Sequence, residues 1–181
     1  MKSTLCLIAG FGVLAFVMGG CNTAPKSAEA KADLHDDATA ALNKFKRADS
    51  DLEALLNKSQ GYAIFPTIGK GGVLVGGAYG KGELFEKNQM IGYCDVTQAS
   101  IGLQLGGQKF SELIVFDSKA ALDNFKSGNF AFSAQASAVA ATAGSSKAAK
   151  FEGGVAVFTL GEAGLMYEAS VGGQKFDYRP K

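Results

Sequence analysis

Residues that commonly carry out catalysis are scarce in this sequence. His35 is the single histidine, so no histidine cluster can bind a metal ion, and we expect His35 to be a solvated or packed helix residue. The stretch Gly69-Lys70-Gly71-Gly72 precedes an expected strand, whereas a phosphate-binding P-loop must open a helix. No nucleophile has an evident base. We therefore expect no enzymatic activity, no metal and no cofactor.

The N-terminal segment indicates a different chemistry, the acylation of a thiol. A short positive start is followed by the uncharged apolar run Leu5–Met18, which is too short to span a bilayer, since that takes about 20 residues. A run of this length suits the hydrophobic region of a secretory signal. Gly19 and Gly20 stand directly before Cys21, and this pattern resembles the signal of bacterial lipoproteins.

We therefore expect residues 1–20 to be a lipoprotein signal peptide and the acylated Cys21 to anchor the chain in a membrane. Stable attachment takes two or more acyl chains, and a lipoprotein cysteine carries several. Asn22 is not the aspartate that tends to retain such proteins at the inner membrane. This favours a bacterial cell-envelope location, lipid-anchored at the outer membrane and facing the periplasm. The alternative is ordinary signal cleavage nearby, with a free Cys21.

Composition divides the rest of the chain. Its 181 residues allow one domain with an appendage, and a formal net charge of +1 argues against a nucleic-acid partner. Of the 24 glycines, 20 lie in residues 61–181 and none in residues 21–60. Collagen is excluded because glycine does not recur at every third position. This uneven distribution of glycine predicts a domain boundary near residue 60.

The glycine-free segment has two parts. Residues 21–33 are rich in Ala, Lys, Ser and Glu and are expected to form a flexible tether behind the lipid anchor. From Leu34 the apolar positions take helical spacing, which predicts one amphipathic helix over 34–60. Its apolar face would pack on the following domain or bind a membrane surface. The mixed charges favour packing, because interfacial helices usually have a more basic face.

Residues 61–181 have the pattern of a sheet. Short runs rich in Val, Ile, Phe and Tyr alternate with glycine, which indicates antiparallel strands, and a helix is expected at 118–126. We expect an α+β fold, mainly β, with a strongly bent antiparallel sheet, barrel- or sandwich-like, an N-terminal amphipathic helix and one short inserted helix. Residues 136–150 suit a strand or a loop. The expected strands are Gly72–Tyr79, Glu83–Glu86, Gln89–Val96, Ser100–Leu105, Phe110–Phe116, Asn129–Ala136, Val155–Leu160, Leu165–Val171 and Gln174–Tyr178.

Cys94 lies in one of these expected strands. Cys6 leaves with the signal and Cys21 is acylated, so Cys94 has no partner for an internal disulfide. We expect a buried structural thiol. A transmembrane barrel of eight strands would fit the length, but the lipoprotein-like signal and the inserted helix argue against it.

The ordered motifs of the glycine-rich part resemble the SYLF domain family, over about residues 55 to 178. The resemblance implies a lipid-binding module, because eukaryotic members bind phosphoinositide-containing membranes and some yeast members bind actin. Bacterial members are commonly secreted proteins or lipoproteins without assigned catalysis. The motifs are Gly61-Tyr62-Ala63-Ile64-Phe65-Pro66, Lys70-Gly71-Gly72, Gly76-Gly77-Ala78-Tyr79-Gly80-Lys81-Gly82, Ala99-Ser100-Ile101-Gly102-Leu103-Gln104-Leu105-Gly106-Gly107 and Ile114-Val115-Phe116-Asp117, with Phe125, Gly128, Gly164 and Gly172.

Lysines beside glycines are the candidates for binding an anionic lipid head group. Glycine turns expose backbone N–H groups that form an anion-binding concavity, and lysine adds positive charge. The candidates are Lys70, Lys81, Lys109 and Lys175, of which Lys70 falls in the family's own motif. The last two belong to a repeated string, since Gly106-Gly107-Gln108-Lys109-Phe110 recurs as Gly172-Gly173-Gln174-Lys175-Phe176. Each is otherwise a solvated surface lysine.

The sequence as a whole predicts a lipid-anchored cell-envelope protein whose SYLF-like domain binds lipid or another anionic amphiphile without catalysis. An apolar site would be lined by Tyr62, Phe65, Tyr79 and Phe85, unless these rings form the core. The alternative function is a structural or interaction protein that docks a protein partner through its glycine-rich sheet. A hydrolase is a third, weaker interpretation.

Overall fold

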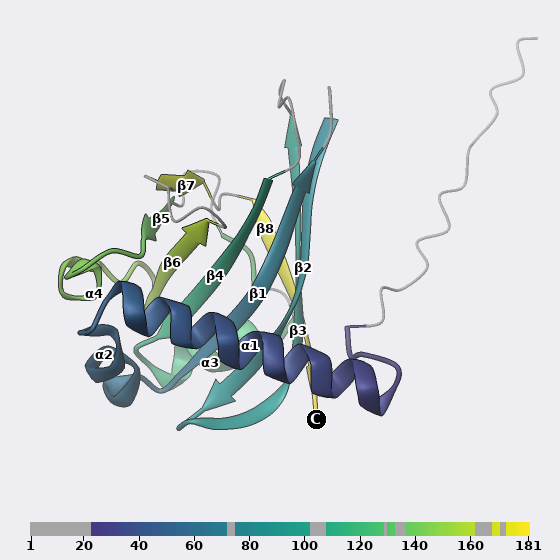
Figure 1. Cartoon of the computed structure of the whole chain (residues 1–181), viewed down its shortest axis with the longest axis horizontal. Coiled ribbons are helices and arrows are strands. Elements are labelled where there is room, and N and C mark those ends of the chain that lie inside the picture. The colour runs from purple at the N-terminus through teal and green to yellow at the C-terminus, as the bar shows by residue number, and fades with distance from the viewer. Residues whose placement is uncertain are drawn as a thin grey trace, which may run out of the picture.

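The computed structural model describes residues 23–71, 75–101, 108–128, 130–132, 137–161, 168–170 and 173–181. These residues form one sheet and four helices (Figure 1). The helices are α1 (Ala28–Ala48), α2 (Leu52–Lys58), α3 (Lys119–Lys126) and α4 (Ser145–Ala148). The strands are β1 (Gly61–Gly71), β2 (Val75–Glu86), β3 (Gln89–Ile101), β4 (Gln108–Phe116), β5 (Ser137–Ala140), β6 (Val155–Gly161), β7 (Glu168–Ser170) and β8 (Gln174–Pro180).

The sheet has the strand order β7-β5-β6-β4-β1-β2-β3-β8. Neighbouring strands are antiparallel, with the exception that β5 runs parallel to β6. The expected α+β, mainly β fold is confirmed, and the parallel pair is a departure from the fully antiparallel sheet. Its cause is α4, because a connection that contains a helix lets the chain enter the next strand in the same direction.

The sheet is strongly bent, so that strands far apart in its order meet on the inner face. The Gln174 side-chain nitrogen on β8 donates a hydrogen bond of 3.0 Å to Glu112 Oε2 on β4, although three strands separate β8 from β4. Phe125 of α3 packs against Phe116 and Phe176, with ring centroids 5.0 and 5.2 Å apart. The inner face of the sheet and α3 therefore enclose the first hydrophobic core.

The N-terminal helix packs on the outer face and forms a second core. Ala38, Ala41 and Phe45 of α1 are buried with Ile64 and Leu113 of the sheet. Figure 1 shows α1 crossing the lower part of this face, so that β1, β2 and β4 extend beyond it. The apolar face of α1 therefore packs on the sheet and is not exposed.

The bounds of the N-terminal helix differ from the expected 34–60. Ser27 caps α1 by accepting a hydrogen bond from the Ala30 N–H, so residues 28–33 of the expected tether are helical. The helix ends at Ala48 because the Asp49 carboxylate accepts hydrogen bonds from Asp51 N and, across the chain, from Ser146 N. Aspartate commonly bonds local backbone in this way and so ends helices. A separate helix, α2, follows.

The first strand, β1, was not expected. It lies between β2 and β4, and its first part, Gly61–Phe65, is buried on both faces and forms a continuous apolar run instead of an alternating one. Pro66 also argues against a strand, but the pairing of β1 with β2 shifts register between Ile64 and Thr67. A proline is tolerated at such an irregularity.

Other expected elements are confirmed with shifted bounds. The inserted helix is α3, capped by Ser118. Residues 136–150 contain both a strand and a short helix, β5 and α4. The expected strands Gly72–Tyr79 and Glu83–Glu86 share one strand, β2, while residues 72–74, 102–107, 133–136 and 162–167 lie outside the described residues. Cys94 is a buried free thiol, as expected.

Two glycines of β2 allow the sheet to bend tightly. A Cβ at Gly80 would lie 2.8 Å from the Ile68 side chain, and a Cβ at Gly82 would lie 2.7 Å from the Phe65 ring. Both distances are shorter than a carbon contact permits. The glycines therefore serve close approach between β2 and β1.

Candidate functional site

Two of the four candidate lysines lie at the ends of one line of residues across the outer face. The strand register places Lys109 opposite Gly69, Gly69 opposite Tyr79, Tyr79 opposite Thr97, and Thr97 opposite Lys175. All five are exposed, and Tyr79 has 42% of its surface accessible. We call these five residues, Lys109, Gly69, Tyr79, Thr97 and Lys175, the transverse strip.

The repeated string in the sequence explains the two ends of the strip. Its copies open β4 and β8, and in each copy the phenylalanine, Phe110 or Phe176, is buried in the inner core. Because side chains alternate along a strand, the preceding Lys109 and Lys175 belong to the opposite, outer face. Neither lysine has an ion-pair or hydrogen-bond partner among the described residues.

The Lys109 end of the strip adjoins a small cavity between α1 and the sheet. The cavity has a volume of about 230 Å³, and Lys44 of α1 lines it together with Lys109. Thr67 and Ser111 add hydroxyl groups, and the Ser111 hydroxyl donates to Pro66 O at 2.6 Å. No Asp or Glu is among the lining residues in the described chain. Two cations and a threonine hydroxyl are suited to an oxyanion.

Lys81, the third candidate, is engaged within the protein. It lies on the same outer face, and its ammonium group donates a hydrogen bond of 3.0 Å to Thr23 O. The neighbouring Asp95 is buried, which raises its pKa, and the nearby Asp177 adds to this, while a hydrogen bond from Thr23 and the charge of Lys81 oppose it. Lys81 therefore fixes the segment before α1.

The structure describes the remaining candidate residues only in part. The backbone of Lys70 pairs with Ala78 and Gln108, but its side chain lies outside the described residues. Cys21 and the signal segment 1–20 also lie outside them. No helix of the described chain combines the length and apolar character that crossing a membrane requires. The described residues contain no group of three or more metal-ligating side chains.

The four rings that were expected to line an apolar site do not come together. Tyr62 and Phe85 stack on the outer face, with centroids 4.9 Å apart. Phe65 is fully buried in the inner core, on the other side of the sheet, next to Phe176. Tyr79 is exposed in the strip. Tyr62 and Phe85 therefore pack in the outer core and Phe65 packs in the inner core. They lie on opposite faces because successive side chains of a strand alternate between the two faces of a sheet.

A buried polar cluster on the inner face was missed by the sequence interpretation. Glu112, Gln174 and Thr159 are completely buried, and Glu112 Oε1, Gln174 Oε1 and Thr159 Oγ1 have no hydrogen-bond partner among the described residues. Burial raises the pKa of the Glu112 carboxyl group to about 7, although the hydrogen bond from Gln174 acts in the opposite direction and lowers it. The cluster is a group of polar atoms that the core holds at a cost in stability.

The fold and the strip together define a class of protein: an α+β domain with a strongly bent sheet and an exposed face bearing lysines, a tyrosine and a two-lysine cavity. Comparison with known proteins names the family. Residues 97–181 match the model of the family described as Ysc84, Las17-binding protein actin regulator, which is the SYLF domain family. The resemblance seen in the sequence is confirmed, and residues 97–181 are similar to the SYLF domain family.

A curated relative extends the likeness. The chain is 27% identical, over 154 residues, to beta cell expansion factor A of Aeromonas veronii, itself a SYLF-family protein. The alignment covers 84% of this chain and 59% of the relative. The family match begins at Thr97, so β1, β2 and the motifs of residues 61–82 precede it. These elements nevertheless belong to the same sheet.

Lys44 is the site residue that the sequence did not reveal. It lies on α1, 65 positions before Lys109, and the two meet only because α1 packs across β1 and β4. The helical periodicity indicates which face of α1 is buried, but not which strand it crosses. The repeated Gly-Gly-Gln-Lys-Phe string, in contrast, was a usable signal for Lys109 and Lys175.

Proposed function

We propose that this chain is a lipid-anchored cell-envelope protein whose SYLF domain binds anionic lipid or another anionic amphiphile and catalyses no reaction. The observation that carries the proposal is the transverse strip, in which the exposed Tyr79 lies between two lysines whose side chains have no partner among the described residues. The SYLF family is associated with lipid binding, which supports the same conclusion. Cys21 would supply the anchor and the strip would supply recognition.

The chemistry of the strip suits a lipid surface. Tyrosine places an apolar ring and a polar hydroxyl at the same position, which is the property that enriches it at membrane interfaces. Each lysine near an anionic membrane surface contributes about 1 kcal/mol to binding. The cavity beside Lys44 and Lys109 offers a place for one phosphate group, and Gly69 leaves the position between Lys109 and Tyr79 without a side chain.

Vesicle flotation tests this function. The chain from residue 22 contains every residue that the structure describes and lacks the acylated cysteine. We expect it to float with vesicles that contain phosphatidylglycerol at low salt, and to float less as salt is added. The double variant Lys109→Glu/Lys175→Glu should bind at least about tenfold more weakly, because two favourable charges become repulsive.

The matched control is Lys26→Glu/Lys58→Glu, which changes the net charge equally at two exposed lysines outside the strip. It should lose much less binding than the strip variant. Equal losses would mean that net charge alone matters and would remove the site assignment. Absence of flotation at low salt would reject lipid recognition by the domain and favour the interaction with a protein partner.

A further inference from the structure

A groove of about 510 Å³ lies where the bent sheet does not close. One wall is the segment Phe130–Phe132, which extends the sheet beyond β8 through the bridge between Ala131 and Lys175. The opposite wall is Val155–Val157 of β6, with Val139 of β5. Since β8 and β5 are near opposite ends of the strand order, the groove is the seam of an incomplete barrel.

The seam groove exposes apolar side chains that the described residues do not cover. Phe130 and Phe132 are half-buried, and their rings pack on Phe176 at 5.7 and 5.4 Å. Val139 is 41% accessible, which makes it one of two large hydrophobic residues that the described chain leaves exposed. Covering such surface is favourable, and the volume lies within the roughly 300–1,000 Å³ of small-molecule sites.

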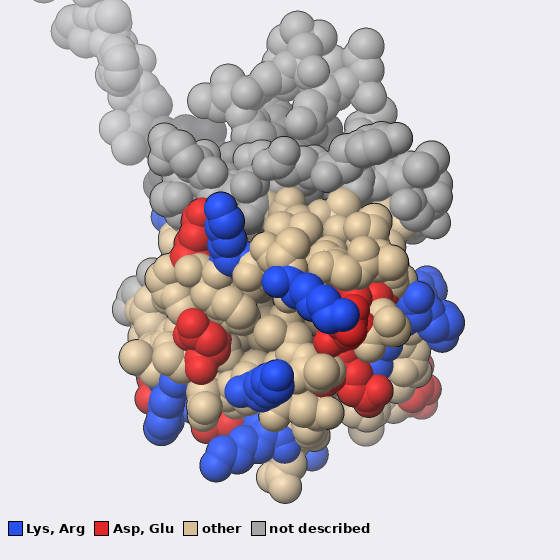
Figure 2. Space-filling model, turned by 90° about the vertical axis from the view of Figure 1, so that its left-hand side faces the viewer, with Lys and Arg blue, Asp and Glu red and all other residues tan. Residues whose placement is uncertain are grey.

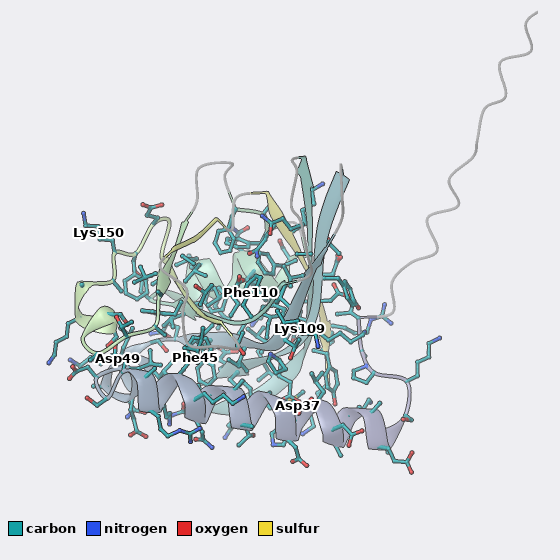
Figure 3. All side chains as sticks on the ribbon, turned by 45° about the horizontal axis from the view of Figure 1, so that its top comes forward. Asp37, Phe45, Asp49, Lys109, Phe110 and Lys150 are labelled. Atoms are coloured by element: carbon teal, nitrogen blue, oxygen red, sulfur yellow. The ribbon has the colours of Figure 1, made fainter. Side chains whose placement is uncertain are left out.

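The charged residues of the seam groove follow α4. Lys150 and Glu152 line it, and Lys150 has no ion-pair or hydrogen-bond partner among the described residues. Around the side of the molecule that carries α4, basic and acidic side chains are interspersed (Figure 2). Lys150 lies well away from Lys109 (Figure 3), whereas Lys175, at the other end of the strip, is paired through its backbone with Ala131 of the groove wall.

We propose that the seam groove binds one free long-chain fatty acid, with the hydrocarbon chain between Phe132 and Val157 and the carboxylate at Lys150. The apolar walls fit a single chain, and the unpaired ammonium group of Lys150 complements a carboxylate. This inference deepens the proposed function, since it also takes an amphiphile as ligand, but it uses residues that the strip does not contain.

Binding of cis-parinaric acid, a fluorescent fatty acid, tests the proposal without vesicles. The chain from residue 22 should raise the fluorescence of the probe, and palmitic acid should displace it. Val139→Trp fills the groove from a partly exposed position and should weaken binding at least tenfold. Ala40→Trp, at an exposed position of α1, is the matched control and should bind like the unchanged chain.

A second pair of variants tests the position of the carboxylate. Lys150→Gln should weaken binding of the acid about threefold, as expected for an exposed ion pair, while Glu152→Gln should strengthen it. Displacement by hexadecanol, which has no charge, should respond to neither change. A response of the alcohol equal to that of the acid would reject the carboxylate assignment. If Val139→Trp does not fold, Lys150→Gln and Glu152→Gln still test whether the fatty acid binds in the seam groove.

The proposal for the seam groove and the proposal for the transverse strip can be tested separately. Lys109→Glu, at the end of the strip away from the groove, should keep fatty-acid binding while weakening vesicle flotation, and Val139→Trp should do the reverse. If the chain does not bind cis-parinaric acid, or if folded Val139→Trp binds as well as the unchanged chain, the proposal is overturned. The two strand edges of the seam would then be better suited to an extended peptide.

Discussion

Glu112 is the residue whose environment departs furthest from that of an ordinary surface glutamate. It is completely buried, its one hydrogen-bond partner among the described residues is the uncharged Gln174, and its second oxygen has no partner there. Burial disfavours the ionised form and raises the pKa from 4.5 to about 7. The folded protein therefore holds a proton on Glu112 at pH values at which the unfolded chain has already released it.

The sign of the pH effect on stability follows from this difference. Between pH 4.5 and about 7 the folded state binds more protons at Glu112 than the unfolded state, so stability falls as the pH rises through this range. The loss amounts to about 3 kcal/mol above pH 7. Glu112→Gln should remove this dependence and unfold at higher urea concentration than the unchanged chain at pH 8. Urea denaturation across pH 5 to 8 measures it.

The exposed Glu152 supplies the control for this measurement. Glu152→Gln removes one carboxylate from the surface and should leave the pH dependence of stability unchanged. If Glu112→Gln retains the full pH dependence, the carboxyl group responsible lies elsewhere, and the assignment of the raised pKa to Glu112 is wrong. Asp95, which is also buried and raised in pKa, would be the next residue to change.

At the level of the elements, Asp49 connects three helices. Its carboxylate follows α1, accepts from Asp51 N just before α2, and accepts from Gly144 N, Ser145 Oγ and Ser146 N at the start of α4. Figure 3 shows Asp49 at the end of α1, beside α4. Burial by itself raises the pKa of Asp49, but these hydrogen bonds outweigh it and lower the pKa to about 2.

Replacing Asp49 should therefore loosen the junction of α1, α2 and α4. Asp49→Asn keeps the size of the side chain but removes a charged acceptor, which should lower the free energy of unfolding by about 2–3 kcal/mol at pH 7. The lowered pKa contributes stability above pH 3.8 that is lost as the pH falls toward 2, so the difference should shrink in acid. Asp37→Asn, on the exposed face of α1, is the control and should change stability little.

The elements also show which parts of the fold the sequence can predict. Alternation identified β8 and helical spacing identified α3, because each has one buried face. Runs rich in Val, Ile and Phe identified β4 and β6, although residues of these two strands contribute to both cores. The strand β1 was missed because its apolar run, Tyr62–Phe65, is short and is followed by Pro66, which argues against a strand. The end of α1 at Ala48 depends on partners near residue 145, and no local pattern contains that information.

For the candidate site, local sequence predicted positions but not neighbours. The repeated string correctly indicated that Lys109 and Lys175 occupy equivalent positions before core phenylalanines. That they lie in one line with Tyr79 depends on the register of five strands, and the register at β1 includes an irregularity near Pro66. The seam groove depends on the bend of the whole sheet, which no segment determines alone.

At the scale of the whole molecule, Thr23, the first described residue, contacts the same face of the sheet that carries the strip. Thr23 is buried, and its carbonyl oxygen accepts a hydrogen bond from the ammonium group of Lys81 on the outer face of β2. Cys21 precedes Thr23 by two residues, a reach of at most about 7 Å in extended chain. Lys81 is two positions from Tyr79 along the same strand, so both point to the outer face. A lipid on Cys21 would therefore keep the transverse strip close to the membrane.

This arrangement predicts a defined orientation of the lipidated protein on its membrane. Intact mass measurement of the mature chain extracted from membranes should show an acylated N-terminal cysteine, Cys21, after loss of residues 1–20. On vesicles, an amine-reactive label should then modify Lys58, on the distant α2, faster than Lys109 and Lys175, because the strip faces the lipid. In detergent-free solution the chain from residue 22 should lose this difference in labelling rate.

Two outcomes would contradict this prediction. A free Cys21 thiol would reject the proposed lipid anchor. Equal labelling of all three lysines on vesicles would keep the anchor and reject the orientation.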